Sequence, residues 1–455
     1  MTVTDAGTDL HDATTAAYRV GIIGGGASGA LVAARLLRDS ARPVDIVIFE
    51  PREELAKGVA YETTDPLHLL NVPACNMSAL TEDPDHFRRW AGCGEKDFAT
   101  RDLYGAYLQA LLVDAQESAR PGASLTHLRA AVIDMGVVPK PWVVTRAHGI
   151  IEFDVLVLAT GHDEPVLPTV LEGLPAERVT GNPWQLNALD VIGDDEDVLI
   201  IGTGLTFVDV ALSIASRTTS TRVHAISRFG LLPQEHEDPW RPGHPAPDLV
   251  TRPVSPRRVI KYVASFGDDW RRGFDSLRPI TAELWMGMTP GTRDQFVRHL
   301  ARYWGVFRHR MAPEVARRFE GLQAAGRIDL RKAEVSEIGI QGERMRVTLS
   351  DGSVLHVDHV VVCTGPSGDM TRNSLGQCLL RHGIAQSGPL GVGYLVDPRT
   401  GVLIAADGHH NTTVLTIGPI RRGVLWESIA MPEIRVQATE VANCILDRAE
   451  RAVAR

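Results

Sequence analysis

Two stretches of the chain share one local pattern, in which a short apolar strand leads into a glycine turn and then a helix. The first is RVGIIGGGASGALVAARLL, from Arg19 to Leu37, and the second is VLIIGTGLTFVDV, from Val198 to Val210. Another apolar strand follows each copy, PVDIVIFE at 43–50 and RVHAISR at 222–228. Each copy therefore predicts a strand, helix, strand unit of a parallel sheet.

The two units lie about 180 residues apart, which predicts an α/β chain with two Rossmann-like dinucleotide-binding domains. A length of 455 residues is enough for two or three packed units. Two further apolar runs, DVLVLATG at 154–161 and DHVVVCTG at 358–365, both stop at Thr-Gly and are expected to be buried strands.

The order of these patterns predicts where the domains begin and end. A Pro-rich loop at 239–256 is followed by helical patterns, which predicts a helical insertion, and a C-terminal helix is expected from about Leu425. We predict a disordered tail at 1–17, a first nucleotide domain made of 18–180 and 350–455, and a second nucleotide domain at 195–349 with the helical insertion at 238–326.

Composition limits the classes of function. Hydrophobic residues make up 44% of the chain and charged residues 23%, the balance of a soluble globular protein. The net charge of −9 gives no reason to expect nucleic acid, and no apolar run is long enough for a membrane span. The first 17 residues have no apolar core of a signal peptide, so a cytoplasmic location is expected.

The five cysteines are scattered along the chain without a CxxC pair. No group of histidines and cysteines has metal-ligand spacing in the sequence, so no metal site is predicted. The same spacing disfavours a redox-active dithiol.

The first glycine turn has the features of a dinucleotide site. Gly24, Gly26 and Gly29 permit a tight turn and a close approach of the backbone to a pyrophosphate at the helix N-terminus. Glu50, 21 residues after Gly29, can accept hydrogen bonds from ribose hydroxyls, which suits FAD or NAD. The mixed loops KGVAY and HLLNVPACNMSAL that follow favour FAD, although each can also be an ordinary surface loop.

The second turn differs in two ways. Gly202 and Gly204 are kept, but Phe207 replaces the third glycine, so that helix and strand cannot pack as closely. The following strand ends in Ser227 and Arg228, where the first copy has Glu50. An arginine can pair with a 2′-phosphate that a carboxylate would repel, so this site predicts NADPH, unless Arg228 is a solvated surface residue.

FAD beside NADPH predicts hydride transfer from nicotinamide to flavin. The chain lacks the cysteine pair of disulfide reductases and the Trp-rich signature of flavin halogenases. Molecular oxygen is then the simplest electron acceptor, with a small molecule as substrate.

Several motifs together resemble a bacterial FAD/NAD(P)-binding protein family: GIIGGGASG, HLLNVPACNMSAL, LIIGTGLTFVDVALS, HAISRFGLLP, FRHRMAPEV, VVVCTGP and IGPIRRGVLWESIAMPEIRVQA. The resemblance spans about Tyr18 to Ala438 and implies a glutathione-reductase-like or flavin-monooxygenase-like fold. Relatives of this family include flavin-dependent N-monooxygenases such as aspartate N-monooxygenase. DVLVLATGH is also similar to a signature of N-hydroxylating enzymes, except that His162 stands where the signature has tyrosine.

The resemblance also assigns the C-terminal segment. Many such flavoproteins hold the flavin with a Gly-Asp pair, whereas this chain has Gly418-Pro419 and no acid there. Backbone from Gly418 to Leu425 and the N-terminus of a helix after Gly423 are the implied substitutes, unless PIRRG is a surface turn with solvated arginines. The candidate cofactor-binding residues are thus Gly24, Gly26, Ala27, Ser28, Gly29, Glu50, Asn71, Met77, Ser78, Thr160, Gly161, Gly202, Gly204, Leu205, Thr206, Ser227, Arg228, Thr364, Gly365, Gly418 and Gly423.

Candidates for substrate binding lie in the insertion. Arg308 and Arg310, in WGVFRHR, can clamp a dicarboxylate or the phosphates of NADPH, or form a salt-bridged helix face. His68 and His236 are candidate proton donors. Trp270, Trp285 and Trp304 are expected in a core.

These features predict an NADPH-consuming flavin monooxygenase that hydroxylates an amino group of a small amino-acid-like substrate. An NADPH:acceptor reductase that serves a quinone or a protein is an alternative. A non-catalytic redox sensor that binds FAD and nicotinamide is a second one.

Overall fold

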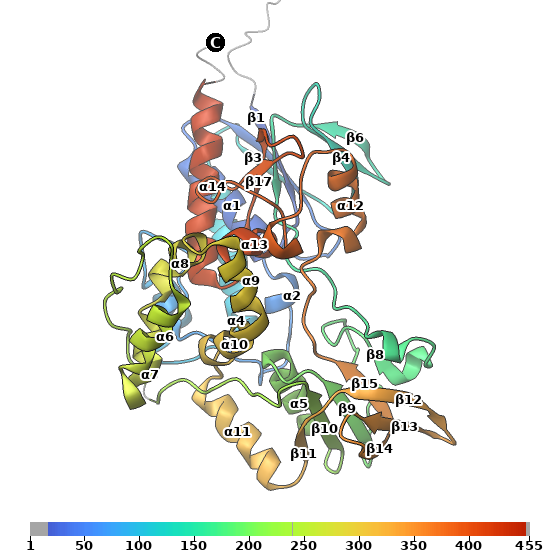
Figure 1. Cartoon of the computed structure of the whole chain (residues 1–455). Helices are drawn as coiled ribbons and strands as arrows, with labels where there is room; N and C mark the ends of the chain where they lie inside the picture. Colours follow the sequence, from blue (N-terminus) through green and yellow to red (C-terminus); the bar gives the residue numbers. More distant parts are fainter. Residues whose placement is uncertain (1–16, 239, 452–455) are drawn as a thin grey trace, which may run out of the picture.

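A computed structural model describes residues 17–238 and 240–451 of the chain. Except for Ala17, the predicted tail at 1–17 lies outside the described residues. The chain forms two parallel sheets and a separate group of helices (Figure 1). This arrangement confirms the predicted α/β class with two Rossmann-like units.

The first sheet has six strands in the order β16-β17-β7-β1-β2-β3. Parallel pairing joins all of them except β16, which runs antiparallel to β17. A strand from the C-terminal part of the chain therefore completes a sheet that starts at the N-terminus, as predicted. The bounds are β1 Tyr18–Ile23, β2 Val44–Phe49, β3 Ser124–Leu128, β7 Val155–Leu158, β16 Val402–Ile404 and β17 His410–Thr416.

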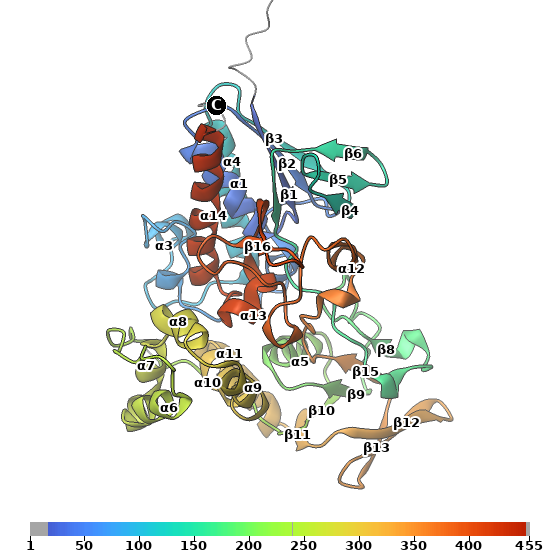
Figure 2. The ribbon, with the colours of Figure 1, turned by 45° about the horizontal axis from the view of Figure 1, so that its top comes forward.

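Helices cover one face of this sheet and a small sheet covers the other (Figure 2). On one face, α1 (Ala27–Asp39) packs between α4 (Arg101–Glu117) and α14 (Met431–Arg451). On the other face, a core that includes Phe49, Met135 and Leu379 joins the sheet to β4–β6 and to α12. These elements are β4 Val132–Gly136, β5 Trp142–Thr145, β6 Gly149–Glu152 and α12 Ser374–Arg381, and the short helices α2 Gly58–Tyr61, α3 His86–Ala91 and α13 Arg422–Leu425 complete this unit.

The second sheet has five strands in the order β11-β10-β9-β15-β8, all parallel. It includes β8 and β15, so the predicted boundaries at 180 and 350 are wrong: both place a strand of this sheet in the first domain. The bounds are β8 Val179–Thr180, β9 Asp197–Ile201, β10 Arg222–Ser227, β11 Ile328–Lys332 and β15 His359–Val362. An antiparallel sheet of β12 Val335–Gln341, β13 Arg344–Leu349 and β14 Val354–Val357 extends from it.

The helical insertion is shorter than predicted. Helices α6, α8, α9 and α10 share their own core, which includes Val259, Trp285 and Phe296, and α7 packs on α6 and α10. In contrast, α11 (Pro313–Ala324) packs on α5 (Leu205–Arg217) and belongs to the second nucleotide domain, so the predicted end at 326 is about 15 residues too late. The insertion helices are α6 Pro256–Ala264, α7 Trp270–Asp275, α8 Thr281–Met286, α9 Pro290–His299 and α10 Ala301–Arg308.

The C-terminal helix also differs from the prediction. It begins at Met431 rather than near Leu425, because Trp426 adopts a positive φ of 64° that ends α13.

None of the helices in the described part of the chain is both long and apolar enough to span a membrane.

Phe207, the residue in place of the third glycine, is fully buried in the second domain. Its ring packs edge to face on Phe319 of α11, with centroids 5.5 Å apart. The side chain that stands in place of the third glycine therefore forms an aromatic contact between α5 and α11.

Replacement of Phe207 by alanine should lower the free energy of unfolding by about 3–5 kcal/mol, because it leaves a cavity between α5 and α11. Urea unfolding followed by far-UV circular dichroism measures this loss. Leu186→Ala, at a side chain that is 92% exposed, is the control and should change stability by less than about 0.5 kcal/mol. Equal stabilities of the two variants would contradict the assigned packing.

Candidate functional site

The first glycine turn lies against the end of the neighbouring strand. Gly24 has a φ of +103°, and a Cβ there would overlap the carbonyl oxygen of Ala159, just after β7. A Cβ on Gly29 would overlap the carbonyl of Gly24, so both positions exclude side chains. Helix α1 starts at Ala27 without a side-chain cap, which leaves the first backbone N–H groups free for an anion.

Glu50 lies beside this turn at the end of β2 and is only 5% exposed. Its carboxylate accepts hydrogen bonds from the backbone N–H groups of Gly25 (3.0 Å) and Arg52 (3.1 Å). These contacts fix the carboxylate next to the helix N-terminus. Oε1 also accepts from Nη1 of Arg52 at 3.4 Å, while Oε2 keeps a lone pair that can accept from a ribose hydroxyl. The loop predicted to wrap a cofactor is close by, since Gly58 lies against Gly26.

The C-terminal segment meets α1 at the same place. Gly418 has a φ of +84°, and a Cβ there would lie 3.0 Å from Oγ of Ser28. The Gly418 N–H donates to Gln437 Oε1 at 2.9 Å. Arg421 is fully buried and donates to the carbonyl and hydroxyl of Thr416, and its burial lowers the pKa to about 10. The alternative of a surface turn with solvated arginines is therefore wrong for Arg421.

The helix predicted to start after Gly423 begins at Arg422 instead. Gly423 sits in the short α13, and its carbonyl accepts a hydrogen bond from Trp285 Nε1 at 3.0 Å. The next helix N-terminus along the chain is that of α14, where Met431 and the two residues before it line a cavity.

The second glycine turn repeats the geometry of the first. Gly202 has a φ of +109°, and a Cβ there would overlap the carbonyl oxygen of Cys363, just after β15. Each turn thus packs against the end of a strand that is followed by Thr-Gly. Gly161 and Gly365 both have positive φ, and they follow Thr160 and Thr364 at the two equivalent strand ends.

Beyond this turn, the end of β10 offers a positive charge. Arg228 is 73% exposed, and its ion pair is a weak one, with 4.0 Å between Nε and Glu334 Oε1. Ser227 is held by Thr203, with 2.8 Å between the hydroxyl oxygens. The guanidinium of Arg302, in α10, lies 4.2 Å from the centre of the Phe229 ring on the same side.

A cavity of about 670 Å³ joins the two nucleotide units and the insertion. Nine predicted residues line it: Asn71, Met77, Gly204, Leu205, Thr206, Ser227, Arg228, Thr364 and Arg308. Ser78 does not, because its hydroxyl donates to carbonyls within its own loop, including that of Asp83 at 2.6 Å. The cavity therefore combines the FAD-side loop with the second glycine turn.

The charges around this cavity have one sign. Arginines 101, 228, 302 and 308 and His309 line it, and no aspartate or glutamate does among the described residues. Arg101 is neutralised by Asp209 in α5, with 2.6 Å between Nη2 and Oδ2. The Nε atom of Arg302 is buried without a hydrogen-bond partner in the described part of the chain. Such a lining suits an anionic ligand.

Arg308 is 5% exposed and belongs to a buried ionic cluster behind the cavity. Its Nη2 lies 3.2 Å from Glu433 Oε1 and 3.9 Å from Glu427 Oε2. Burial opposes the ionisation of Glu427, yet Arg308 and His309 outweigh it and hold the pKa of this carboxyl well below its usual range. Sequence reasoning missed Glu427 and Glu433, because they lie over 100 residues away from Arg308.

Arg310 does not join Arg308 in a clamp. It is buried, pairs with Asp275 of α7, and does not line the cavity. His309, the residue between the two arginines, has an extended backbone conformation and lines the cavity instead. The predicted pair of arginines is therefore split between the cavity wall and the core of the insertion.

His68 is a contact between domains, not a cavity residue. Its Nδ1 lies 2.7 Å from the hydroxyl of Thr63, and its Nε2 lies 2.8 Å from that of Ser213 in α5. Ser213 in turn donates to Asp65. Both ring nitrogens are used, so the structure gives His68 a docking role and not that of a proton donor.

His236 is also a structural residue. It is buried, and its Nε2 lies 3.0 Å from the backbone carbonyl of Asn71, which lines the cavity. Burial and then the charge of Arg310 lower its pKa to about 3, so the ring is neutral at physiological pH. A neutral ring with a pKa this low does not donate a proton readily, which contradicts the predicted role.

A second cavity, of about 440 Å³, lies within the insertion on the other side of α10. Its lining is apolar and includes Trp270, Trp285, Trp304 and Trp426. Trp285 is buried in the core as predicted and stacks on Trp426, with ring centroids 4.7 Å apart. Trp270 and Trp304 are only partly buried and belong to the cavity wall.

The comparisons with known proteins agree with this arrangement. A sequence family described as FAD-NAD(P)-binding matches residues 21–163. These residues contain the first glycine turn, Glu50 and the strand end at Thr160, so this part of the chain is a FAD-NAD(P)-binding domain. No curated protein matches the chain by sequence.

Solved structures with the same fold cover almost the whole chain. L-lysine 6-monooxygenase from Pseudomonas syringae has a TM-score of 0.64 at 18% identity, over 94% of this chain and 99% of its own. Lysine monooxygenase NbtG from Nocardia farcinica has a TM-score of 0.52 at 14% identity, with the same coverage. The ferredoxin reductase of the CYP199A2 system from Rhodopseudomonas palustris has a TM-score of 0.50 at 15% identity, over 94% and 76%.

Arg228→Ala should raise the Michaelis constant for NADPH at least tenfold and leave that for NADH nearly unchanged, because only NADPH carries the 2′-phosphate. Steady-state oxidation of both nucleotides measures this difference. Arg222→Ala, at the opposite end of β10, is the matched control and should change neither constant. An equal effect of Arg228→Ala on both nucleotides would remove this residue from the site.

The pKa of His236 predicts acid sensitivity. Unfolded histidine binds a proton below about pH 6.5, whereas the folded ring stays neutral down to about pH 3, so stability falls as the pH falls between these values. From pH 7 to pH 5 this one group should remove about 2 kcal/mol from the free energy of unfolding.

His236→Gln keeps a donor for the Asn71 carbonyl and should lose about 2 kcal/mol less than the natural protein over that range. Urea unfolding at both pH values measures the difference. The control His409→Gln, at an imidazole that is 86% exposed, should lose as much as the natural protein. Identical pH profiles of all three proteins would rule out the buried neutral ring.

Proposed function

We propose that the chain is an NADPH-dependent FAD monooxygenase that hydroxylates an amino group of a small amino-acid-like substrate. One observation carries the proposal: a single cavity touches the second glycine turn, the loop on the FAD side and the charged end of α10. A nicotinamide, part of a flavin and a small anionic substrate can therefore meet in one cavity.

The residues around the first turn fit FAD. Glycines without room for a side chain, an uncapped helix N-terminus and the buried Glu50 match the pyrophosphate and the ribose of this cofactor. When bound, FAD would accept the hydride and activate oxygen. The roles of the protein are to bind, to orient and to exclude water.

Positive charge positions NADPH and the substrate. Arg228 and Arg302 lie beside the second turn, where they can pair with phosphates of the nucleotide. Arg308 presents a charge at the insertion side, and its Nε is buried without a partner in the described part of the chain. We assign Arg308 and His309 to the carboxylate of an amino-acid-like substrate.

The buried carboxylates keep Arg308 in place. Glu427 also accepts a hydrogen bond from Trp304 Nε1 at 2.6 Å, so α10 is tied to the segment before α14. This contact fixes the insertion beside the cavity and so keeps Arg308 and His309 in its wall. The similarity of fold to lysine monooxygenases over 94% of the chain supports an amino group as the site of attack.

The decisive experiment offers the purified FAD-loaded protein a panel of amino acids and amines. We expect one class of substrate to stimulate oxygen uptake and NADPH oxidation together, with a product heavier by one oxygen atom in mass spectrometry. Arg308→Lys should raise the Michaelis constant of that substrate at least tenfold, because lysine cannot make the bidentate contact.

Arg257→Ala, at an exposed position of α6, is the control and should behave as the natural protein. If NADPH is oxidised only in the presence of quinones or carrier proteins, the protein is a reductase instead. If FAD and NADPH bind but no acceptor supports turnover, the redox-sensor alternative holds.

A further inference from the structure

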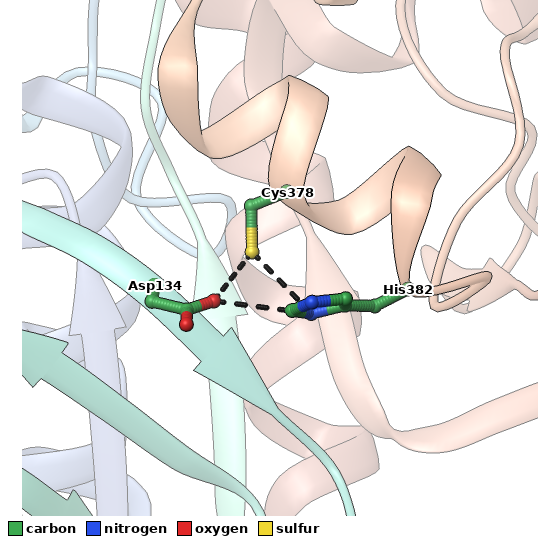
Figure 3. A group of neighbouring side chains, drawn as sticks. All are labelled: Asp134, Cys378 and His382. Carbon is green, nitrogen blue, oxygen red and sulfur yellow. Dashed lines mark hydrogen bonds and ion pairs between the residues drawn. The ribbon is translucent and has the colours of Figure 1, made fainter.

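Three side chains with metal-binding atoms meet at one point outside the nucleotide sites: Asp134, Cys378 and His382 (Figure 3). The sulfur of Cys378 lies 2.6 Å from Asp134 Oδ1 and 3.6 Å from His382 Nδ1. His382 Nδ1 lies 3.8 Å from the same carboxylate oxygen. All three donor atoms therefore lie within 4.8 Å of one another.

Two elements far apart in the sequence bring these atoms together. Cys378 lies in the second half of α12 and His382 is the residue that follows the helix, about one turn later, so their side chains lie on the same side. Asp134 comes from the middle of β4, 244 residues earlier, and faces this helix turn. The sequence prediction of no metal site rested on local spacing, which cannot detect such a set.

The donor set has the chemistry of a zinc site. One sulfur, one imidazole nitrogen and one carboxylate oxygen are the ligand types that Zn²⁺ takes in proteins. With ordinary zinc–ligand lengths in a tetrahedron, donor atoms are separated by about 3.3–3.6 Å. The separation of sulfur and nitrogen has this value, and that of nitrogen and oxygen exceeds it by a few tenths of an ångström.

In the metal-free state the thiol of Cys378 donates its proton to Asp134 Oδ1, at a separation shorter than that of an ordinary S–H···O hydrogen bond. Zinc would replace this proton: the S–H bond breaks, the proton passes to solvent, and the thiolate and the carboxylate both bind the cation. The pair must then open by about 0.9 Å, which the half-exposed Asp134 side chain can do by rotation.

The exposure of the three residues defines the kind of site. Cys378 is buried at 2%, whereas the side chains of Asp134 and His382 are 41% and 49% exposed. Three protein ligands on the buried side leave a fourth position open to water. Binding there would clamp α12 onto β4 and join the C-terminal and N-terminal parts of the first domain.

We propose that Asp134, Cys378 and His382 form a binding site for one Zn²⁺ ion that fastens α12 to the small β4–β6 sheet. The proposal is independent of the proposed function, since the site lies outside the residues that line the main cavity. The readouts of this site do not depend on turnover.

The test uses the full chain after treatment with a chelator, titrated with Co²⁺ and then with Zn²⁺. We expect one equivalent of Co²⁺ to produce the visible bands of a tetrahedral ion and a thiolate-to-cobalt charge-transfer band in the ultraviolet. Zn²⁺ should displace Co²⁺ stoichiometrically and raise the midpoint of thermal unfolding by at least about 2 °C.

Cys378→Ser keeps a proton donor for Asp134, so the fold should persist while the charge-transfer band disappears. His382→Ala and Asp134→Asn should weaken Zn²⁺ binding at least tenfold. The controls are Cys75→Ser, a cysteine remote from the site, and His409→Ala, whose imidazole lies 3.2 Å from Asp407 but near no cysteine ligand. Both control variants should bind Zn²⁺ with the affinity of the natural chain. Far-UV circular dichroism of every variant checks that it is folded.

Absence of the charge-transfer band in the natural chain would overturn the proposal. Its persistence in Cys378→Ser would do so as well, because another cysteine would then bind the cation. Equal Zn²⁺ affinities of the site variants and the two controls would assign binding to the surface instead.

Discussion

Both nucleotide units depend on one close contact, between a glycine of positive φ and the last carbonyl of the neighbouring strand. Gly24 makes it with Ala159 and Gly202 makes it with Cys363. A single methyl group on either glycine would overlap that oxygen, so the turn could not reach the strand end. This contact places the helix N-terminus at the carboxyl edge of the sheet, where dinucleotides bind in such folds.

The rest of the site follows from this constraint. Because each turn fixes the N-terminus of one helix, the free N–H groups and the side chains at the neighbouring strand ends face the same side of each unit. The contacts of Arg101 and His68 with α5 then hold the second unit against the first. The insertion adds Arg302 and Arg308, and the cavity between the three parts collects positive charge without a lining carboxylate in the described residues.

Local features of this chain could be predicted from its sequence. The glycine positions and the buried Glu50 beside the first turn follow from a pattern within about 30 residues, because backbone sterics act locally. The fold class and both glycine turns were predictable for the same reason. The packing of Phe207 was not, since its ring contacts Phe319 of α11, 112 residues later. The role of the exposed Arg228 in NADPH binding stays a prediction.

Long-range features could not be predicted. The strand β15 has the same apolar pattern as strands of the first sheet, so only pairing shows to which sheet it belongs. The strand β8 has two residues and no apolar run, so the sequence does not indicate it at all. The helix α11 has the same amphipathic pattern as the insertion helices, although it packs on α5.

The roles of polar side chains depend on partners that are distant in sequence. His236 is a plausible proton donor until its burial and the Asn71 carbonyl are seen. Arg310 is a plausible substrate clamp until Asp275 is found beside it. The set of Asp134, Cys378 and His382 is invisible at a separation of 244 residues.

The central claim is that the two turns hold FAD and NADPH so that hydride can pass between them within one cavity. Anaerobic mixing of the FAD-loaded protein with NADPH in a stopped-flow spectrometer tests this claim most directly. The account predicts bleaching of the flavin absorbance by one equivalent of NADPH, faster than by NADH at the same concentration. Flavin that binds at the first turn but stays oxidised with both nucleotides would contradict it.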